Sequence, residues 1–205
     1  ATTNATGIMP NNDYDRYNFS FRNTTNFLNN KFILDTSANY IIQNDKNMVS
    51  QGQYFNPLTS LYLFPRGEDF SDVAVYERYD DLSGVNTQYW PYGDLGGVSS
   101  QNPYWIMNRM NRENDRRRYK LAASLQYNII EGLNVQGRVS IDNTESKYTE
   151  KFHAGTVGNF AGPKGRYKEE NRLDRQVYAD VLANFNKTFN EFNVTANLGA
   201  SIKDL

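Results

Sequence analysis

The feature that most constrains the fold is the alternation of apolar and polar residues in the stretch LNVQGRVSID, residues 133–142. Successive side chains of a β-strand point to opposite faces of a sheet, so the odd-numbered residues form an apolar face and the even-numbered residues a polar face. In a soluble sheet the apolar face packs on a protein core. In a membrane barrel it contacts lipid, and the polar face lines the lumen. The function therefore depends on what the apolar face contacts.

The same alternation recurs in five further stretches, which pair across short connections into three antiparallel hairpins. The six predicted strands are residues 17–28, 31–42, 119–130, 133–142, 176–189 and 192–202. The predicted turns are Asn29-Asn30, Glu131-Gly132 and Asn190-Glu191. Asparagine and glycine tolerate the positive φ of a tight turn, which favours two-residue connections.

One of these stretches has an alternative interpretation. Leu173, Val177, Val181 and Phe185 recur every four positions, so residues 173–185 also fit a helix. The strand interpretation is favoured, because Val177, Ala179, Val181, Ala183 and Phe185 alternate and a hairpin partner follows directly.

Strand length and loop length favour lipid over a protein core. The predicted strands exceed the usual ~5–6 residues of globular sheets and match the ~9–11 residues that cross a bilayer at a tilt. The short turns alternate with long connections at residues 43–118 and 143–172, as in outer-membrane barrels with short periplasmic turns and long extracellular loops. We therefore predict an all-β fold, an antiparallel transmembrane β-barrel segment, with residues 1–205 part of a single barrel domain and residues 1–16 ending an extracellular loop.

Composition excludes several other classes. The absence of cysteine removes disulfides, thiolate zinc sites and cysteine nucleophiles, and a net charge of −1 gives no basic field for nucleic acid. No run approaches the ~18 apolar residues of a transmembrane helix, and the first residues do not resemble a signal peptide. A mean hydropathy of −0.74 is compatible with barrel strands, which need apolar residues only at alternate positions. The 15 tyrosines and 12 phenylalanines fit the aromatic girdles of such barrels.

Residues 102–119, NPYWIMNRMNRENDRRRY, and the closing FNKTFNEFNVTANLGASIKD resemble SusC/RagA-type, TonB-linked outer-membrane transporters. In that family an Asn-Pro-Tyr-Trp segment, here Asn102 to Trp105, ends an extracellular loop before an Arg-Tyr strand entry, here Arg118-Tyr119. A Lys-Thr-Phe strand end, here Lys187 to Phe189, leads into a Leu-Gly-Ala strand, here Leu198 to Ala200. The resemblance covers a middle portion of the barrel, with no recognisable plug or TonB box.

The resemblance implies a barrel of roughly 22 strands with a plugged lumen in the outer membrane of a Gram-negative bacterium. It also implies a SusD-type lipoprotein lid, energy from TonB through parts outside this chain, and import of oligosaccharides or peptides. The alternative is a soluble, secreted or surface β-sandwich that binds carbohydrate through aromatic loops.

The long loop supplies the candidate ligand contacts. Its segments QYWPYGDLGG and NPYW offer flat aromatic faces for sugar rings or peptide side chains, together with polar partners. The candidates are Tyr89, Trp90, Tyr92, Asp94, Asn102, Tyr104 and Trp105. Packing of the loop on itself is the open alternative for the same side chains.

No residue pattern predicts an enzyme, a metal site or a cofactor. His153 lies in a glycine-rich loop without a nucleophile or metal cluster, and its glycines do not form a Walker motif. Arg116, Arg117 and Arg118 suit either lipopolysaccharide phosphates at the outer rim or a solvated strand entrance paired with Glu113 and Asp115.

Overall fold

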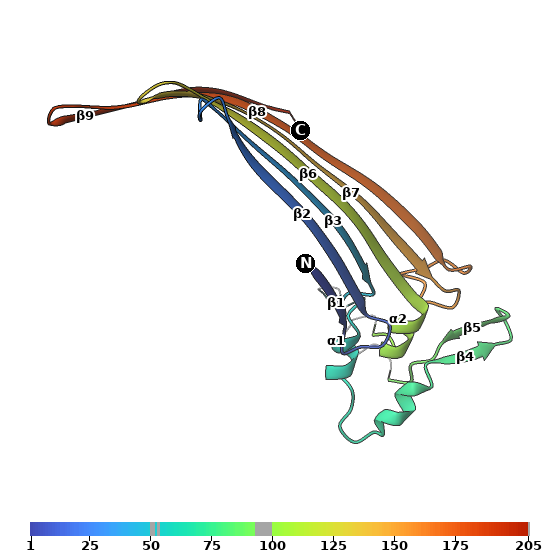
Figure 1. Cartoon of the computed structure of the whole chain (residues 1–205). Coiled ribbons are helices and arrows are strands. Elements are labelled where there is room, and N and C mark those ends of the chain that lie inside the picture. The colour runs from blue at the N-terminus through green and yellow to red at the C-terminus, as the bar shows by residue number, and fades with distance from the viewer. Residues whose placement is uncertain (50–51, 53, 93–99, 205) are drawn as a thin grey trace.

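The computed structural model describes the chain except for residues 50–51, 53, 93–99 and 205. Most of it is one antiparallel sheet of seven strands in the order β1-β2-β3-β6-β7-β8-β9 (Figure 1). These strands are β1 (Thr2–Thr6), β2 (Asp13–Phe27), β3 (Phe32–Lys46), β6 (Met110–Ile130), β7 (Leu133–Phe152), β8 (Arg166–Phe189) and β9 (Phe192–Asp204). The predicted antiparallel β architecture is confirmed.

The sheet strands are longer than the sequence pattern predicted. β6 begins at residue 110 rather than 119, β7 ends at 152 rather than 142, and β8 begins at 166 rather than 176. The connections predicted at 43–118 and 143–172 therefore shorten to 47–109 and 153–165. The sequence pattern does not reveal these extensions, because both of their faces are mostly polar and apolar and polar residues do not alternate. They are strands because the hydrogen-bonded ladder of each predicted hairpin continues into them.

The structure decides two further points at the strands. The favoured strand interpretation of residues 173–185 is confirmed and the helical alternative is excluded, because these residues lie within β8 and pair with β7 along their whole length. Residues 1–16 are not simply the end of a loop, because Thr2–Thr6 form β1 and pair with β2. The β1 residues have no apolar alternation, which explains why the sequence did not reveal this strand.

The three predicted turns lie at the end of the sheet opposite the loops (Figure 1). Glu131-Gly132 and Asn190-Glu191 are two-residue turns, with φ of 84° at Gly132 and 51° at Asn190. The first turn is longer than predicted and spans residues 28–31, because the last pair of the ladder is Phe27 with Phe32. Within this turn, Leu28, Asn29 and Asn30 all have positive φ. Positive φ cannot be accommodated in a paired strand, so the ladder stops at Phe27.

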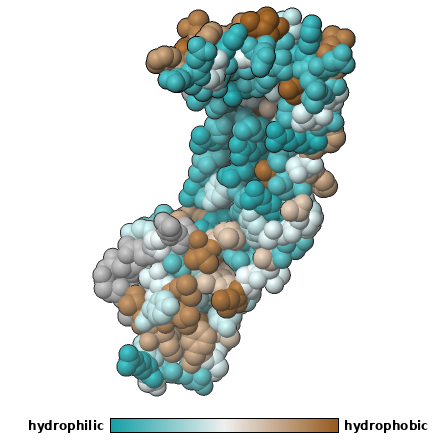
Figure 2. Space-filling model, turned by 60° about the vertical axis from the view of Figure 1, so that its left-hand side comes forward, coloured by the Kyte–Doolittle hydropathy of each residue, from teal (hydrophilic) through white to brown (hydrophobic). Residues whose placement is uncertain are grey.

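The register gives the sheet two chemically different faces. Paired residues of an antiparallel sheet share a face, and the pairs Phe19/Tyr40, Leu125/Gly137 and Val181/Ala200 all fall on the same one. The large hydrophobic residues exposed on this apolar face include Phe19, Phe21, Phe27, Tyr40, Tyr119, Leu121, Leu125, Tyr127, Ile129, Val139, Val181, Leu198 and Ile202. The opposite, polar face carries Asn, Ser, Gln and ion-paired residues. It forms the hydrophilic middle of the surface in Figure 2.

Residues 47–109, named the cap here, fold into short elements beyond the strand ends. They are α1 (Pro57–Tyr62), η1 (Phe70–Ala74), the hairpin β4 (Glu77–Asp80) and β5 (Val85–Gln88), and α2 (Pro103–Arg109). No helix among the described residues is long and apolar enough to cross a membrane.

Candidate ligand-binding surface in the cap

The cap is held to the sheet by a small hydrophobic core. Trp105, Ile106 and Met110 pack with Phe152 at the end of β7 and with Ala161 of the β7–β8 loop. Trp105 is 0% exposed, and its indole Nε1 donates a hydrogen bond to Thr156 Oγ1 at 3.1 Å. Because Met110 and Phe152 belong to the polar face, the cap lies over the polar side of the sheet.

Both α-helices of the cap begin with the same dipeptide, Asn-Pro. The Asn56 side chain accepts a hydrogen bond from the Leu58 backbone N–H at 3.0 Å, and that of Asn102 accepts one from Tyr104 at 2.9 Å. The proline at the first helical position lacks the N–H that would otherwise be unpaired. This arrangement starts each short helix at a fixed residue.

Asn102 is also the centre of the cap's hydrogen bonding. Its Nδ2 donates to the carbonyl oxygens of Val73 at 2.8 Å and Tyr89 at 3.2 Å, while its backbone N–H donates to Gln88 Oε1 at 2.6 Å. The side chain is fully buried. Asn102 therefore joins η1, the segment after β5 and α2 into one unit.

An ion pair fixes the hairpin of the cap to α2. The Arg109 guanidinium donates two hydrogen bonds to the Glu77 carboxylate, at 2.8 and 2.9 Å. Glu77 raises the pKa of Arg109 through these hydrogen bonds. Arg78, on the same hairpin, stacks over the Tyr89 ring at 3.3 Å from its centroid.

Half-buried and exposed aromatic side chains form a continuous surface across the cap, named the aromatic row here. Ring centroids are 5.0 Å apart for Trp90 and Tyr92, 4.9 Å for Tyr92 and Phe64, and 5.4 Å for Phe64 and Phe70. Phe70 then lies 6.5 Å from Tyr104, which lies 6.4 Å from Tyr76. Most pairs are tilted or edge-on, the geometries that the charge distribution of aromatic rings favours.

Two polar groups within the aromatic row have unusual surroundings. Among the described residues, the buried indole Nε1 of Trp90 has no hydrogen-bond partner. Burial raises the pKa of the Tyr92 hydroxyl, and the nearby carboxylates of Glu68 and Asp72 raise it further. Tyr92 therefore stays neutral at physiological pH and remains able to donate a hydrogen bond.

The structure divides the predicted ligand residues into two groups. Tyr89, Trp90, Tyr92 and Tyr104 are partly exposed, whereas Asn102 and Trp105 are buried in contacts within the cap. The second group has the packing role that the sequence left open. Asp94 lies outside the described residues. The sequence pattern did not identify Phe64, Phe70 and Tyr76 as part of this surface. They precede both predicted segments, Phe64 by 38 positions relative to Asn102, and come next to them only through the fold of the cap.

The polar face of the sheet carries diagonal and direct ion pairs. Arg22 pairs with Asp35, Arg118 with Asp142 and Arg138 with Asp180, at nitrogen-to-oxygen distances of 2.9, 2.6 and 2.9 Å. These pairs connect β2 to β3, β6 to β7 and β7 to β8. A water-filled interior suits such a surface, because paired charges retain hydration there.

The described residues contain no cluster of metal-ligating side chains. No group of three or more His, Asp or Glu residues that could hold a metal ion is found there. The His153 side chain is exposed, and its backbone N–H donates to the Arg109 carbonyl oxygen at 2.9 Å.

A long antiparallel sheet with one apolar face, one ion-paired face, tight turns at one end and a folded cap at the other has the architecture of a β-barrel wall segment. Solved structures agree with this class. The chain superposes on the RagAB peptide importer in its closed-closed and open-open states, each with a TM-score of 0.57 and 15% identity over 94% of this chain. A further structure of the RagAB peptide transporter gives a TM-score of 0.54 at 15% identity over 95%.

These likenesses concern the fold alone, because the identity is low. The chain covers 22%, 21% and 22% of the lengths of the three matched chains, or about a fifth of each. Searches of protein-family models and of curated protein sequences find no match.

Proposed function

We propose that this chain is part of a TonB-dependent outer-membrane transporter that imports peptides or oligosaccharides. Residues 1–205 contribute wall strands and extracellular loops to one barrel domain. The observation that carries the proposal is the uncovered apolar face. Leu198, for example, is 79% exposed, and no second sheet packs on this face among the described residues.

Two levels of aromatic side chains support lipid as the partner of the apolar face. Near the turns, Phe32 stacks between Phe27 and Tyr127, with centroids 5.5 and 4.6 Å apart. Tyr40 and Tyr119 pair at the other end of the apolar band. Residues 119–129 of β6 span this band, in accord with the ~9–11 residues of a tilted transmembrane strand and with aromatic girdles at its two limits.

This placement orients the protein across the membrane. Short turns face the periplasm and longer loops the exterior in such barrels, so the cap lies outside. The polar face lines the lumen, and the cap covers the lumen's outer end. The aromatic row is then positioned to contact incoming substrate or a SusD-type lipoprotein lid, while TonB acts through other parts of the protein.

Peptides are the better supported substrate class. The structures that share this fold are named peptide importers, and the aromatic row offers rings of several orientations rather than the single flat platform that suits one sugar ring. Transport rather than catalysis is the proposed role. A carbohydrate-binding β-sandwich is disfavoured, because a sandwich requires a second sheet over the apolar face.

The test compares two arginine substitutions at adjacent positions of β7 in the intact protein. Val139→Arg places a charge on the proposed lipid face, where Val139 is 46% exposed, and costs roughly 2–4 kcal/mol near the bilayer midplane. Ser140→Arg places the same charge on the lumen side and serves as the control. Loss of heat-modifiable gel mobility should occur for Val139→Arg alone, and equal tolerance of both would overturn the proposal.

A further inference from the structure

The apolar face of the sheet becomes charged between the Tyr40/Tyr119 pair and the cap. Tyr40, Tyr119, Asn143 and Arg175 form one row across β3, β6, β7 and β8. The next row toward the cap contains Ile42, Arg117, Glu145 and Leu173. Arginine therefore first appears on this face at the aromatic level and in the row directly above it.

Neither arginine side chain has a partner within the fold. Arg117 and Arg175 are exposed, and in the part of the chain that the structure describes neither side chain makes a hydrogen bond, an ion pair or a ring contact. Cations nearer the cap on the same face are paired, Lys147 with Glu169 at 3.1 Å and Lys151 with Glu113 at 2.9 Å. The two unpaired guanidinium groups, with Glu145 as the one carboxylate among the eight residues of the two adjacent rows, give these rows a net positive charge.

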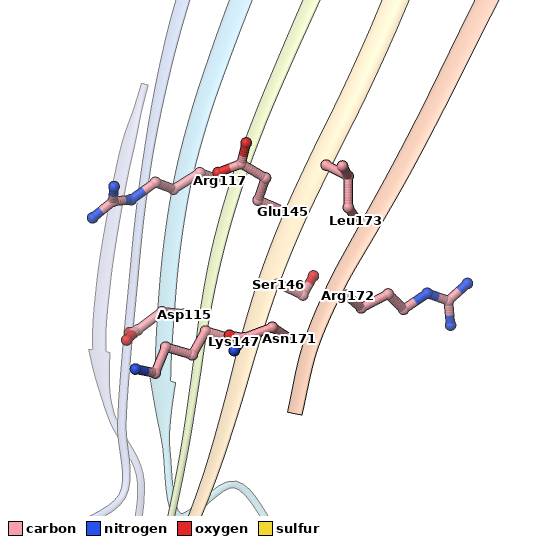
Figure 3. Close-up of a pocket in the computed structure, with 8 residues that line it drawn as sticks. All are labelled: Asp115, Arg117, Glu145, Ser146, Lys147, Asn171, Arg172 and Leu173. Carbon is pink, nitrogen blue, oxygen red and sulfur yellow. The ribbon is translucent and has the colours of Figure 1, made fainter. Parts of the chain in front are cut away.

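A hollow of about 430 Å³ lies beside Arg117 and contains both charged and apolar surface. Figure 3 shows Arg117, Glu145 and Leu173 on three successive strands, with Asp115 and Lys147 one row nearer the cap. Leu173 is 64% exposed, so an apolar side chain extends the lipid-facing band into the charged zone. A ligand that fits this surface has acyl chains along the apolar band and an anionic headgroup on the side nearer the cap.

We propose that Arg117 and Arg175 bind the phosphate groups of lipopolysaccharide in the outer leaflet. The proposal rests on the membrane orientation given under Proposed function. β6 and β8 are two strand spacings apart, or about 10 Å, so the two side chains reach separate phosphates of one disaccharide headgroup. Guanidinium groups bind phosphate through paired, charge-assisted hydrogen bonds. Glu145 in the Arg117 row opposes an anion, so the two guanidinium groups bind the phosphates against one carboxylate.

The experiment uses the full-length transporter in nanodiscs and measures lipopolysaccharide retention by native mass spectrometry. The double variant Arg117→Gln/Arg175→Gln should retain the lipid about tenfold less tightly than wild type, because two charge-assisted contacts are lost. Arg116→Gln is the matched control. Arg116 lies next to Arg117 but on the polar face, where its Nε donates to Ser146 Oγ at 3.4 Å, so retention should not change.

Two further measurements separate the possible outcomes. Wild type should retain dephosphorylated lipopolysaccharide about as weakly as the double variant retains the native lipid, and the Arg→Lys pair should recover part of the loss. Equal retention by the double variant and the control, or no effect of removing the phosphates, would overturn the lipid site. Wild type that fails to fractionate with the outer membrane would instead overturn the proposed function.

Discussion

The two tryptophans of the chain, Trp90 and Trp105, both lie in the cap but have different surroundings. Trp105 fills the core beneath α2 and is hydrogen-bonded to Thr156, whereas Trp90 is half-buried in the aromatic row. Truncating a buried tryptophan costs about 3–5 kcal/mol. Truncating Trp90 removes a ring from the surface with a smaller effect on folding.

We therefore expect Trp105→Ala to loosen the cap and Trp90→Ala to weaken ligand or lid binding. Limited proteolysis of the intact protein should show faster cleavage of the cap in Trp105→Ala only. Calorimetry with a peptide ligand or the lid should show weaker binding for Trp90→Ala with the cap intact. Unchanged affinity in Trp90→Ala would assign this residue to packing as well.

Tyr148 provides a pH-dependent prediction at the junction of cap and sheet. Burial raises its pKa to about 12, and its hydroxyl also donates a hydrogen bond to Glu150 Oε1 at 2.9 Å. Because the folded-state pKa lies above the unfolded value of 10.0, the stabilisation is present below pH 10 and is lost as the pH rises toward 12. Ultraviolet titration should show a late tyrosinate transition that Tyr148→Phe removes. A difference spectrum that titrates near 10 would contradict the assignment.

At the scale of elements, the turns determine how the strands pair. Gly132 has a φ of 84°, and a Cβ added there would meet the Asn186 carbonyl oxygen at 2.4 Å, from the neighbouring strand β8. Gly137 lies in the middle of β7 with nothing within 4 Å of an added Cβ. The two glycines thus differ in backbone conformation and in space.

We expect Gly132→Ala to destabilise the β6–β7 hairpin by more than about 1 kcal/mol and Gly137→Ala to be neutral or slightly stabilising. Urea unfolding of the detergent-solubilised, full-length protein measures both. Equal midpoints for the two variants would show that the turn at Gly132 relaxes without cost.

Some of these elements were predictable from the sequence and others were not. Alternation and turn residues are local signals, so the six strands and their hairpin partners were predictable from them. The cap was not, because its core joins Trp105 to Phe152 and Ala161, which are distant in sequence. Its helices did leave a signal in the two Asn-Pro dipeptides at 56–57 and 102–103. The strand extensions left none, since their register comes from neighbouring strands.

At the scale of the whole molecule, both edges of the sheet are unpaired within the described residues. The strand order ends at β1 on one side and β9 on the other, and these two strands do not pair. Unpaired backbone N–H and C=O groups cost several kcal/mol each in hydrocarbon, so an open edge is not stable in a bilayer. In the proposed transporter, the two edges therefore pair with the adjoining strands of the barrel.

This open sheet predicts that the 205-residue chain alone transports nothing. Its seven sheet strands fall short of the ~8 of the smallest outer-membrane barrels, and its free edges favour association with other chains. Liposomes reconstituted with the purified 205-residue chain should take up labelled peptide no faster than protein-free liposomes, while the full-length transporter provides the positive control for correct insertion. Cross-linking should report oligomers or aggregates through β1 and β9 rather than monomers. Uptake above background by the chain as a monomer would show that it closes on itself, and the barrel-wall assignment would then fail.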